Sequence, residues 1–273
     1  MRTQIKNIIR TISPKFFKFL QNTQELRRTV KKKLPLYSEY YQALLLGKPY
    51  WGQIYGGGPY APNQSKGILL KNTVNQCGGG KCLEVGSWTG GSSMIIGNEL
   101  KRQGKGILYC IDTWRGAPNY DTEKCDRERW ALNRDWVWKI FNRNLRTSKL
   151  TTYVIPVRKS SDEAIKDFPR ESFDFVFIDG DHAYKQFKRD LLNYKELVKV
   201  GGVLCGDDLE KFLPQVDEKL TKINAEEDWL LEYGGYHPGI TLAIKEVFND
   251  QVGVKDSFWA VRRTDTGWKK LDL

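Results

Sequence analysis

Residues 82–91 read Cys82-Leu-Glu-Val-Gly-Ser-Trp-Thr-Gly-Gly91. Leu83 and Val85 are typical of a short buried strand, and Gly86 and Gly90 allow a tight turn after it. A strand, a glycine turn and a helix in this order usually bind a ligand at the helix N-terminus. This stretch therefore predicts an α/β fold with a ligand site at the turn.

A helix is expected to follow the turn, from Met94 to Leu100. Ser92 and Ser93 stand just before it, where hydroxyl side chains commonly cap a helix. The sequence therefore predicts that these two serines form the cap.

Two residues depart from the Gly-x-Gly-x-x-Gly pattern of dinucleotide sites. The second glycine of that pattern lets a pyrophosphate approach the backbone, and here Trp88 takes its place. The Glu84 carboxylate would repel a pyrophosphate but suits a cation. S-adenosylmethionine carries a sulfonium and an ammonium and no phosphate, so it fits this turn better than NAD or ATP. A plain turn without a ligand is the alternative.

A second apolar strand, Gly106 to Ile111, ends on Asp112. An acid at this point of a nucleoside-binding α/β fold accepts the ribose hydroxyls, and we expect Asp112 to do so. It lies 28 residues after Glu84, further than the usual spacing of about 20. The alternative is that Asp112 caps the segment that follows.

Two later apolar strands also end in acids. Residues 173–178 run into Asp179, and residues 203–206 run into Asp207 and Asp208. Neighbouring parallel strands lie about 4.8 Å apart, so the acids at their carboxyl ends can share one cation. Three carboxylates with room for water suit Mg²⁺. A structural zinc site is not expected, because no cluster of His and Cys is present.

Asp181 and His182 are candidates for proton transfer. A hydroxyl must lose its proton as it attacks a methyl group, and a nearby carboxylate or imidazole can take that proton. We expect Asp181 to be the base, with His182 as the alternative; His182 could instead contact adenosine or cap a helix. His237 is expected to be structural. The alternative for all these acids is a set of solvated turn residues and helix caps.

Length and composition limit the protein class. A chain of 273 residues can hold one full α/β domain with extensions. Its five cysteines include no Cys-x-x-Cys pair and are expected to be thiols in a reducing compartment such as the cytoplasm. No apolar run reaches the length of about 18 residues that a transmembrane helix needs.

Residues 1–33 carry most of the net charge of +11. They hold ten Lys or Arg against the single Glu25. Apolar residues recur between these charges at helical spacing, although Pro14 divides or kinks the helix. This basic arm could lie on an anionic membrane, pack on the domain or a partner, or be a transit peptide. No nucleic-acid face is expected, because the charge belongs to one arm.

Two further segments are expected to border the site. Residues 34–67 mix tyrosines with Gly56-Gly-Gly-Pro59 and suggest a lid, or else an ordinary surface connection. Residues 113–137 form an aromatic insertion that could shape an acceptor pocket. Ser160 and Ser161 are expected to cap a later helix. The main domain is then residues 68–273.

Four motifs carry a resemblance to a known family. They are Glu84-Val-Gly-Ser-Trp-Thr-Gly90-Gly-Ser, Ile111-Asp-Thr-Trp114, Phe177-Ile-Asp-Gly-Asp-His-Ala-Tyr184 and Gly201-Gly-Val-Leu-Cys-Gly-Asp-Asp208. Over roughly residues 68–262 the chain resembles class I methyltransferases of the macrocin O-methyltransferase and cephalosporin-hydroxylase-like type.

The resemblance implies a Rossmann-like fold with helices on both faces of a seven-stranded, mostly parallel sheet. Its antiparallel last strand would be Ser257 to Arg262. The resemblance also implies S-adenosylmethionine as donor, Mg²⁺ on Asp179, Asp207 and Asp208, and Asp181 as base. Family acceptors are often sugar hydroxyls. The basic arm, the insertion and His182 depart from the pattern and leave the acceptor in doubt.

The prediction is an S-adenosylmethionine-dependent, Mg²⁺-assisted O-methyltransferase for a hydroxyl of a small molecule or glycan. The alternative is a non-catalytic cofactor-binding or membrane-associated partner protein with the same fold. A homo-oligomer is compatible with the sequence. The residues expected to contact the cofactor are Glu84, Gly86, Ser87, Trp88, Gly90, Ser92, Asp112, Trp114, Ser161 and Asp179.

Overall fold

The computed structural model describes residues 42–43, 45–50, 65–116 and 135–273. The basic arm, most of the expected lid and most of the 113–137 insertion lie outside the described residues.

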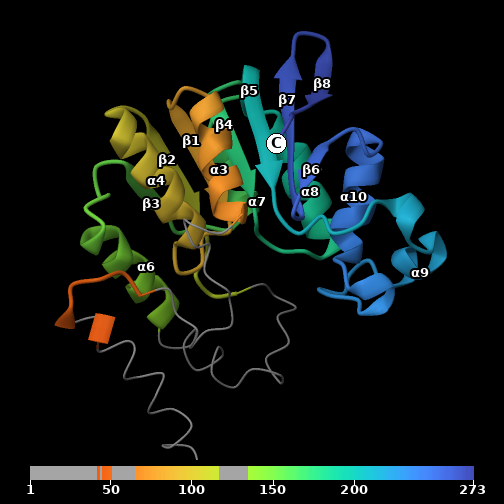
Figure 1. Ribbon diagram of the computed structural model, residues 1–273, viewed down its shortest axis with the longest axis horizontal. Coiled ribbons are helices and arrows are strands. Elements are labelled where there is room, and N and C mark those ends of the chain that lie inside the picture. The colour runs from red at the N-terminus through yellow and green to blue at the C-terminus, as the bar shows by residue number, and fades with distance from the viewer. Residues whose placement is uncertain (1–41, 44, 51–64, 117–134) are drawn as a thin grey trace, which may run out of the picture.

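An open sheet forms the centre of the molecule (Figure 1). Within the described ranges it has eight strands in the order β3-β2-β1-β4-β5-β7-β6, with β8 paired to β7. Strands β1 to β5 are parallel, and β7 is antiparallel to β5, β6 and β8. The strands are Lys81–Val85 (β1), Ile107–Ile111 (β2), Val154–Val157 (β3), Phe173–Ile178 (β4), Val198–Gly206 (β5), Gly253–Lys255 (β6), Phe258–Thr264 (β7) and Gly267–Lys270 (β8).

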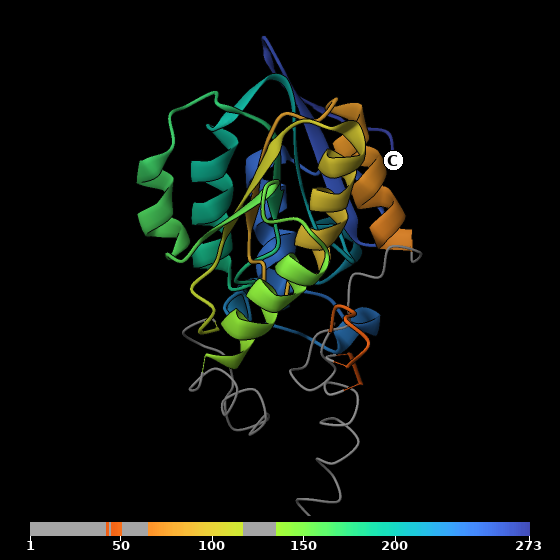
Figure 2. The ribbon, with the colours of Figure 1, turned by 90° about the vertical axis from the view of Figure 1, so that its left-hand side faces the viewer.

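Helices cover both faces of the sheet, as the view in Figure 2 shows. One face packs against α3, α4 and α6, and the other against α7, α8 and α10. The α-helices are Ser65–Gln76 (α3), Gly91–Gln103 (α4), Trp136–Thr147 (α6), Ser161–Ala164 (α7), Tyr184–Lys195 (α8), Glu218–Ile223 (α9) and Pro238–Phe248 (α10). Three short 3₁₀ turns are Ile165–Asp167, Leu213–Gln215 and Glu232–Gly234.

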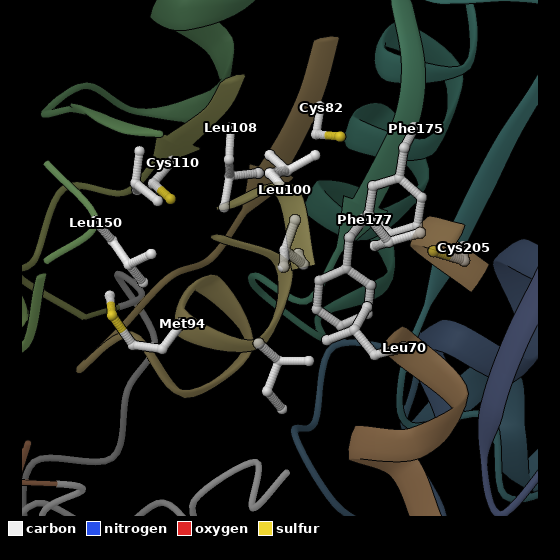
Figure 3. Packing of buried hydrophobic residues seen from close by; sticks show 14 of the residues in the cluster. Leu70, Cys82, Met94, Leu100, Leu108, Cys110, Leu150, Phe175, Phe177 and Cys205 are labelled. Carbon is white, nitrogen blue, oxygen red and sulfur yellow. The ribbon is translucent and has the colours of Figure 1, made fainter. Parts of the chain in front are cut away.

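Strand β4 shows why the sheet is covered on both sides. Successive side chains of a strand point to opposite faces, so Phe175 and Phe177 enter one core and Val176 and Ile178 the other. Phe175 and Phe177 belong to the cluster that also contains Leu70 of α3 (Figure 3). A strand buried on both faces reads as a continuous apolar run, and residues 175–178 of β4 form such a run.

The predicted fold class is confirmed, with changes in detail. The predicted antiparallel strand is β7, and β8 adds one strand to the expected seven. Helix α3 begins at Ser65, inside the segment expected to be a lid. Strand β5 begins at Val198, five residues before the start of the strand expected at residues 203–206.

The cysteines agree with the expected thiols. All four described cysteines, Cys77, Cys82, Cys110 and Cys205, are unpaired, and the last three are buried. None of the described helices combines the length and apolar character needed to cross a bilayer.

Candidate functional site

The acids predicted from the sequence meet at one edge of the sheet. Asp112 follows β2, Asp179 follows β4, and Asp207 and Asp208 follow β5. The strand order places β2, β1, β4 and β5 side by side. The carboxyl ends of these parallel strands therefore form one continuous edge, with the Gly86 turn after β1 between Asp112 and Asp179.

Gly86 allows the turn to pass directly against the backbone of the next strand. Its φ is 87°, and a Cβ atom at this position would lie 1.9 Å from the carbonyl oxygen of Asp179. A side chain is therefore excluded both by the left-handed conformation and by contact. The turn after β1 therefore contacts the backbone that follows β4 at this glycine.

Glu84 is fully buried and accepts hydrogen bonds from three hydroxyls. Ser87 Oγ lies 2.7 Å from Glu84 Oε2, and Ser92 and Ser93 also donate to the carboxylate. Burial raises the pKa of Glu84, and these three hydrogen bonds oppose that rise. The cap predicted for helix α4 is wrong, because Gly90 is the N-cap and no side chain caps it. The serines instead donate hydrogen bonds to a buried carboxylate. Glu84 thereby fixes the loop between β1 and α4.

Asp112 holds the same loop from the neighbouring strand. Its Oδ2 accepts the backbone N–H groups of Ser87 at 3.0 Å and Trp88 at 2.8 Å, and Oδ1 accepts that of Trp114 at 2.6 Å. Burial raises the pKa of Asp112, and the backbone N–H groups lower it. A carboxylate has about four acceptor positions, so these bonds leave capacity for a ligand hydroxyl. The predicted ribose contact stays a prediction.

Two tryptophans have left-handed backbone conformations beside Asp112. The φ angles of Trp88 and Trp114 are 44° and 54°. Trp114 Nε1 donates to the carbonyl oxygen of Trp88 at 2.7 Å. The Trp114 ring is fully buried, 4.5 Å from the ring of Trp138 and 4.8 Å from that of Phe141. Its indole therefore belongs to the core, so only its backbone could meet a cofactor.

Ser161 lies at the first position of α7. The N-cap is Ser160, which forms a capping box with Glu163. The cap predicted at Ser160 is therefore confirmed, whereas Ser161 lies inside the helix. Ser161 Oγ accepts a hydrogen bond from Gln186 at 3.1 Å. In this conformation its hydroxyl is directed toward α8, and its predicted cofactor contact stays a prediction.

Asp179 and Asp208 form an acidic pocket with His182. One donor atom from each of these side chains lies within 4.8 Å of the others. Burial raises the pKa of Asp179 well above its ordinary value, and the carboxylates of Asp208 and Asp207 raise it further. Carboxylates crowded in this way are stabilised by a cation.

Lys66 supplies one cation, which the sequence patterns did not indicate. Its Nζ lies 2.6 Å from Asp207 Oδ1 and 3.6 Å from Asp208 Oδ1. Burial would lower the pKa of Lys66, but Asp207 and Asp208 raise it above its ordinary value. Lys66 lies in the first turn of α3, where no pattern links it to β5. The predicted set of three aspartates therefore fits a metal ion only in part, because Asp207 already has an ammonium partner.

His182 bridges two carboxylates. Nδ1 lies 2.8 Å from Asp228 Oδ1, and Nε2 lies 3.4 Å from Asp208 Oδ2. Burial would lower the pKa of His182, but the bond to Asp228 and the charges of Asp208 and Asp179 raise it to about 9. The ring centroid of His237 lies 4.6 Å from that of His182. His237 Nδ1 is 3.1 Å from Glu210 Oε2, and the residue precedes α10 as its N-cap.

Asp181 follows Asp179 by two residues. Its Oδ1 accepts the backbone N–H of Ala183 at 3.0 Å, which fixes the turn into α8. Within the described part of the chain, its other carboxylate oxygen has no hydrogen-bond partner. Asp181 can therefore accept a proton without giving up its structural contact.

Comparison with known proteins identifies the domain. The sequence profile of a family described as a methyltransferase domain matches residues 83–209. These 127 residues, just under half of the chain, are similar to that methyltransferase domain. The match begins in β1 and ends just after Asp208, so it covers the whole edge that carries the acids.

Solved structures with a similar fold include O-methyltransferases. The structure described as the O-methyltransferase NovP is 19% identical, with a TM-score of 0.51, and the match covers 72% of this chain and 78% of that one. A caffeoyl-CoA O-methyltransferase-like protein from Staphylococcus aureus is 14% identical, with a TM-score of 0.51, covering 88% and 97% of the two chains. The chain therefore has the fold of the class I methyltransferases.

Proposed function

We propose that this methyltransferase transfers the methyl group of S-adenosylmethionine to a hydroxyl oxygen of a small molecule or glycan, with a sugar hydroxyl favoured. The observation that carries the proposal is the contact between the Gly86 turn and Asp179. This contact supports a nucleoside site directly beside the carboxylates of the acidic pocket. Two proteins of similar fold are described as O-methyltransferases.

The donor would bind over the Gly86 turn. Glu84 and Asp112 hold that turn from both sides, so the backbone is fixed before a ligand arrives. Asp112 would bind the ribose through its remaining acceptor capacity. Preorganisation of this kind lowers the entropy cost of binding.

Asp181 is the proposed base. Both ring nitrogens of His182 face carboxylates, at 2.8 Å and 3.4 Å, whereas Asp181 has an oxygen without a partner among the described residues. A carboxylate within reach of the acceptor hydroxyl can take its proton during methyl transfer. His182 is the alternative base if it moves away from Asp228.

A divalent ion, Mg²⁺ by resemblance, would be held at the same edge by Asp179 and Asp208. Asp207 could join as the third ligand only if Lys66 leaves it. When bound, such an ion lowers the pKa of a coordinated hydroxyl.

Methyl transfer from a sulfonium to an oxyanion neutralises charge, so the reaction needs no oxyanion hole. Most of the rate enhancement would then come from positioning the two reactants and excluding water. The rigid turn and the adjoining pocket would serve that alignment.

The test is transfer of a labelled methyl group to a panel of glycan and phenolic hydroxyls. Wild-type protein should label at least one acceptor, and Asp181→Asn should lower turnover about 100-fold or more while keeping adenosylhomocysteine affinity. Loss of turnover in EDTA would support the metal. Binding of adenosylhomocysteine without transfer to any acceptor or lysate extract would favour the non-catalytic alternative.

The basic arm of residues 1–33 is proposed to bind anionic membranes. Liposome flotation of the full chain should exceed that of a chain lacking residues 1–33, and the difference should shrink in high salt. Equal flotation of both chains would contradict this proposal.

A further inference from the structure

The side chains that converge on the acidic pocket differ from the predicted magnesium set. Donor atoms of Asp179, His182 and Asp208 lie within 4.8 Å of one another. Asp207 instead has its Oδ1 2.6 Å from Lys66 Nζ. A carboxylate oxygen paired with an ammonium is a poor ligand for a divalent ion, because the two cations repel each other. In this arrangement a nitrogen donor has replaced the third carboxylate.

His182 is oriented as metal-binding histidines usually are. Its Nδ1 lies 2.8 Å from Asp228 Oδ1, so the N–H on Nδ1 donates to that carboxylate. Nε2 faces Asp208, whose Oδ2 is 3.4 Å away, so a metal ion that displaces the Nε2 proton would meet this nitrogen and that carboxylate together. A carboxylate that accepts from one ring nitrogen fixes the tautomer and makes the other nitrogen a better ligand.

Building on the proposed function, we propose that the cation site of this enzyme consists of Asp179, His182 and Asp208, and that it selects a transition ion such as Mn²⁺, Fe²⁺, Co²⁺ or Zn²⁺ over Mg²⁺. Imidazole suits these ions, whereas Mg²⁺ prefers oxygen ligands. Lys66 determines this specificity, because its ammonium keeps Asp207 out of the ligand set.

Co²⁺ tests the nitrogen ligand without relying on turnover. The full chain, stripped of metal by a chelator, is titrated with Co²⁺ alone and followed by its visible absorption. His182→Asn should change the Co²⁺ spectrum and weaken Co²⁺ binding about 10-fold or more, while Mg²⁺ affinity measured by calorimetry stays within about two-fold. Asp228→Asn should weaken Co²⁺ binding about 10-fold through the orientation of the ring.

Four further variants distinguish the proposed ligand set from the set of three aspartates. His237→Asn removes the neighbouring imidazole and should leave the Co²⁺ spectrum unchanged. Asp207→Asn should leave Co²⁺ affinity unchanged, whereas Asp179→Asn should lower it. Lys66→Met removes the ammonium beside Asp207 and should raise Mg²⁺ affinity about 10-fold. An unaltered spectrum in His182→Asn, an equal loss in Asp207→Asn and Asp179→Asn, or no Co²⁺ binding would each overturn the proposal.

Calorimetry with adenosylhomocysteine separates this inference from the proposed function. If adenosylhomocysteine binds but the Co²⁺ spectrum shows no nitrogen ligand, the metal assignment alone is overturned. Nitrogen-ligated Co²⁺ without adenosylhomocysteine binding would confirm the metal ligands but contradict the proposed methyl transfer.

Discussion

The ammonium of Lys66 lies 2.6 Å from the carboxylate of Asp207, which follows it by 141 residues. Asp207 is only 5% exposed, and its neighbours Asp179 and Asp208 add to the negative charge. The first turn of α3 is thereby joined to the carboxyl end of β5. This ion pair ties the beginning of the described domain to its acidic pocket.

Lys66→Met should destabilise the protein in the absence of divalent ions. The variant removes the ammonium partner of a buried carboxylate, and since Lys66 is itself about one-third exposed, the expected loss is about 1–2 kcal/mol of unfolding free energy. Lys71→Met, an exposed position on the same helix, should change it by less than about 0.5 kcal/mol. Urea unfolding in EDTA measures both, and equal effects would show that the ion pair contributes nothing.

Gly86→Ala should be severely destabilising. Its Cβ would lie 1.9 Å from the backbone oxygen of Asp179 at a φ of 87°, so strands β1 and β4 would have to separate. We expect a loss above about 3 kcal/mol. Gly104→Ala is the matched control, because Gly104 has a φ of 68° and nothing within 4 Å of the new Cβ, and it should cost about 1 kcal/mol. A loss at Gly86 no larger than that at Gly104 would contradict the close approach.

Asp112→Asn should weaken donor binding and loop stability together. The amide retains one acceptor oxygen, so the hydrogen bonds to one carboxylate oxygen are lost, either from Ser87 and Trp88 or from Trp114. Adenosylhomocysteine affinity should fall about 10-fold or more, and unfolding free energy by about 1–3 kcal/mol. Calorimetry and urea unfolding give the two values, with the exposed Asp167→Asn as control. Full affinity in Asp112→Asn would exclude the ribose contact.

The raised pKa of Asp190 predicts that the stability of the fold depends on pH, independently of the acidic pocket. Burial raises its pKa to about 7 from the ordinary 3.8, although hydrogen bonds from Ser161 and Gln186 oppose the rise. As pH rises from about 4 to 7, the unfolded chain loses this proton first. Asp190 therefore destabilises the folded state progressively over that range, and the full loss is present above pH 7.

Asp190→Asn should remove this dependence. The difference in unfolding free energy between the variant and wild type should grow from pH 4 to pH 8 by about 3–4 kcal/mol. Asp265→Asn, at an exposed position in the turn between β7 and β8, is the control and should show no such growth. Parallel curves for wild type and Asp190→Asn would show that Asp190 titrates normally.

The sequence by itself determined the fold class and the edge of the sheet that carries the chemistry. Buried strands that end in Asp112, Asp179 and Asp207 are local patterns, and parallel strands bring their carboxyl ends to one edge whatever the details of packing. The turn at Gly86 could be predicted for the same reason, because a glycine directly after a buried strand is also a local pattern.

Only the tertiary structure decided how those acids are used. Three serines donate to Glu84, Lys66 pairs with Asp207, and Asp228 orients His182. The Lys66 and Asp228 contacts join residues far apart in the sequence, so no periodicity or short motif marks them. The serines do lie beside Glu84 in the sequence, but the pattern that predicts a helix cap is the same one that supplies donors to a buried carboxylate. Burial of that carboxylate, which depends on the whole sheet, selects between the two.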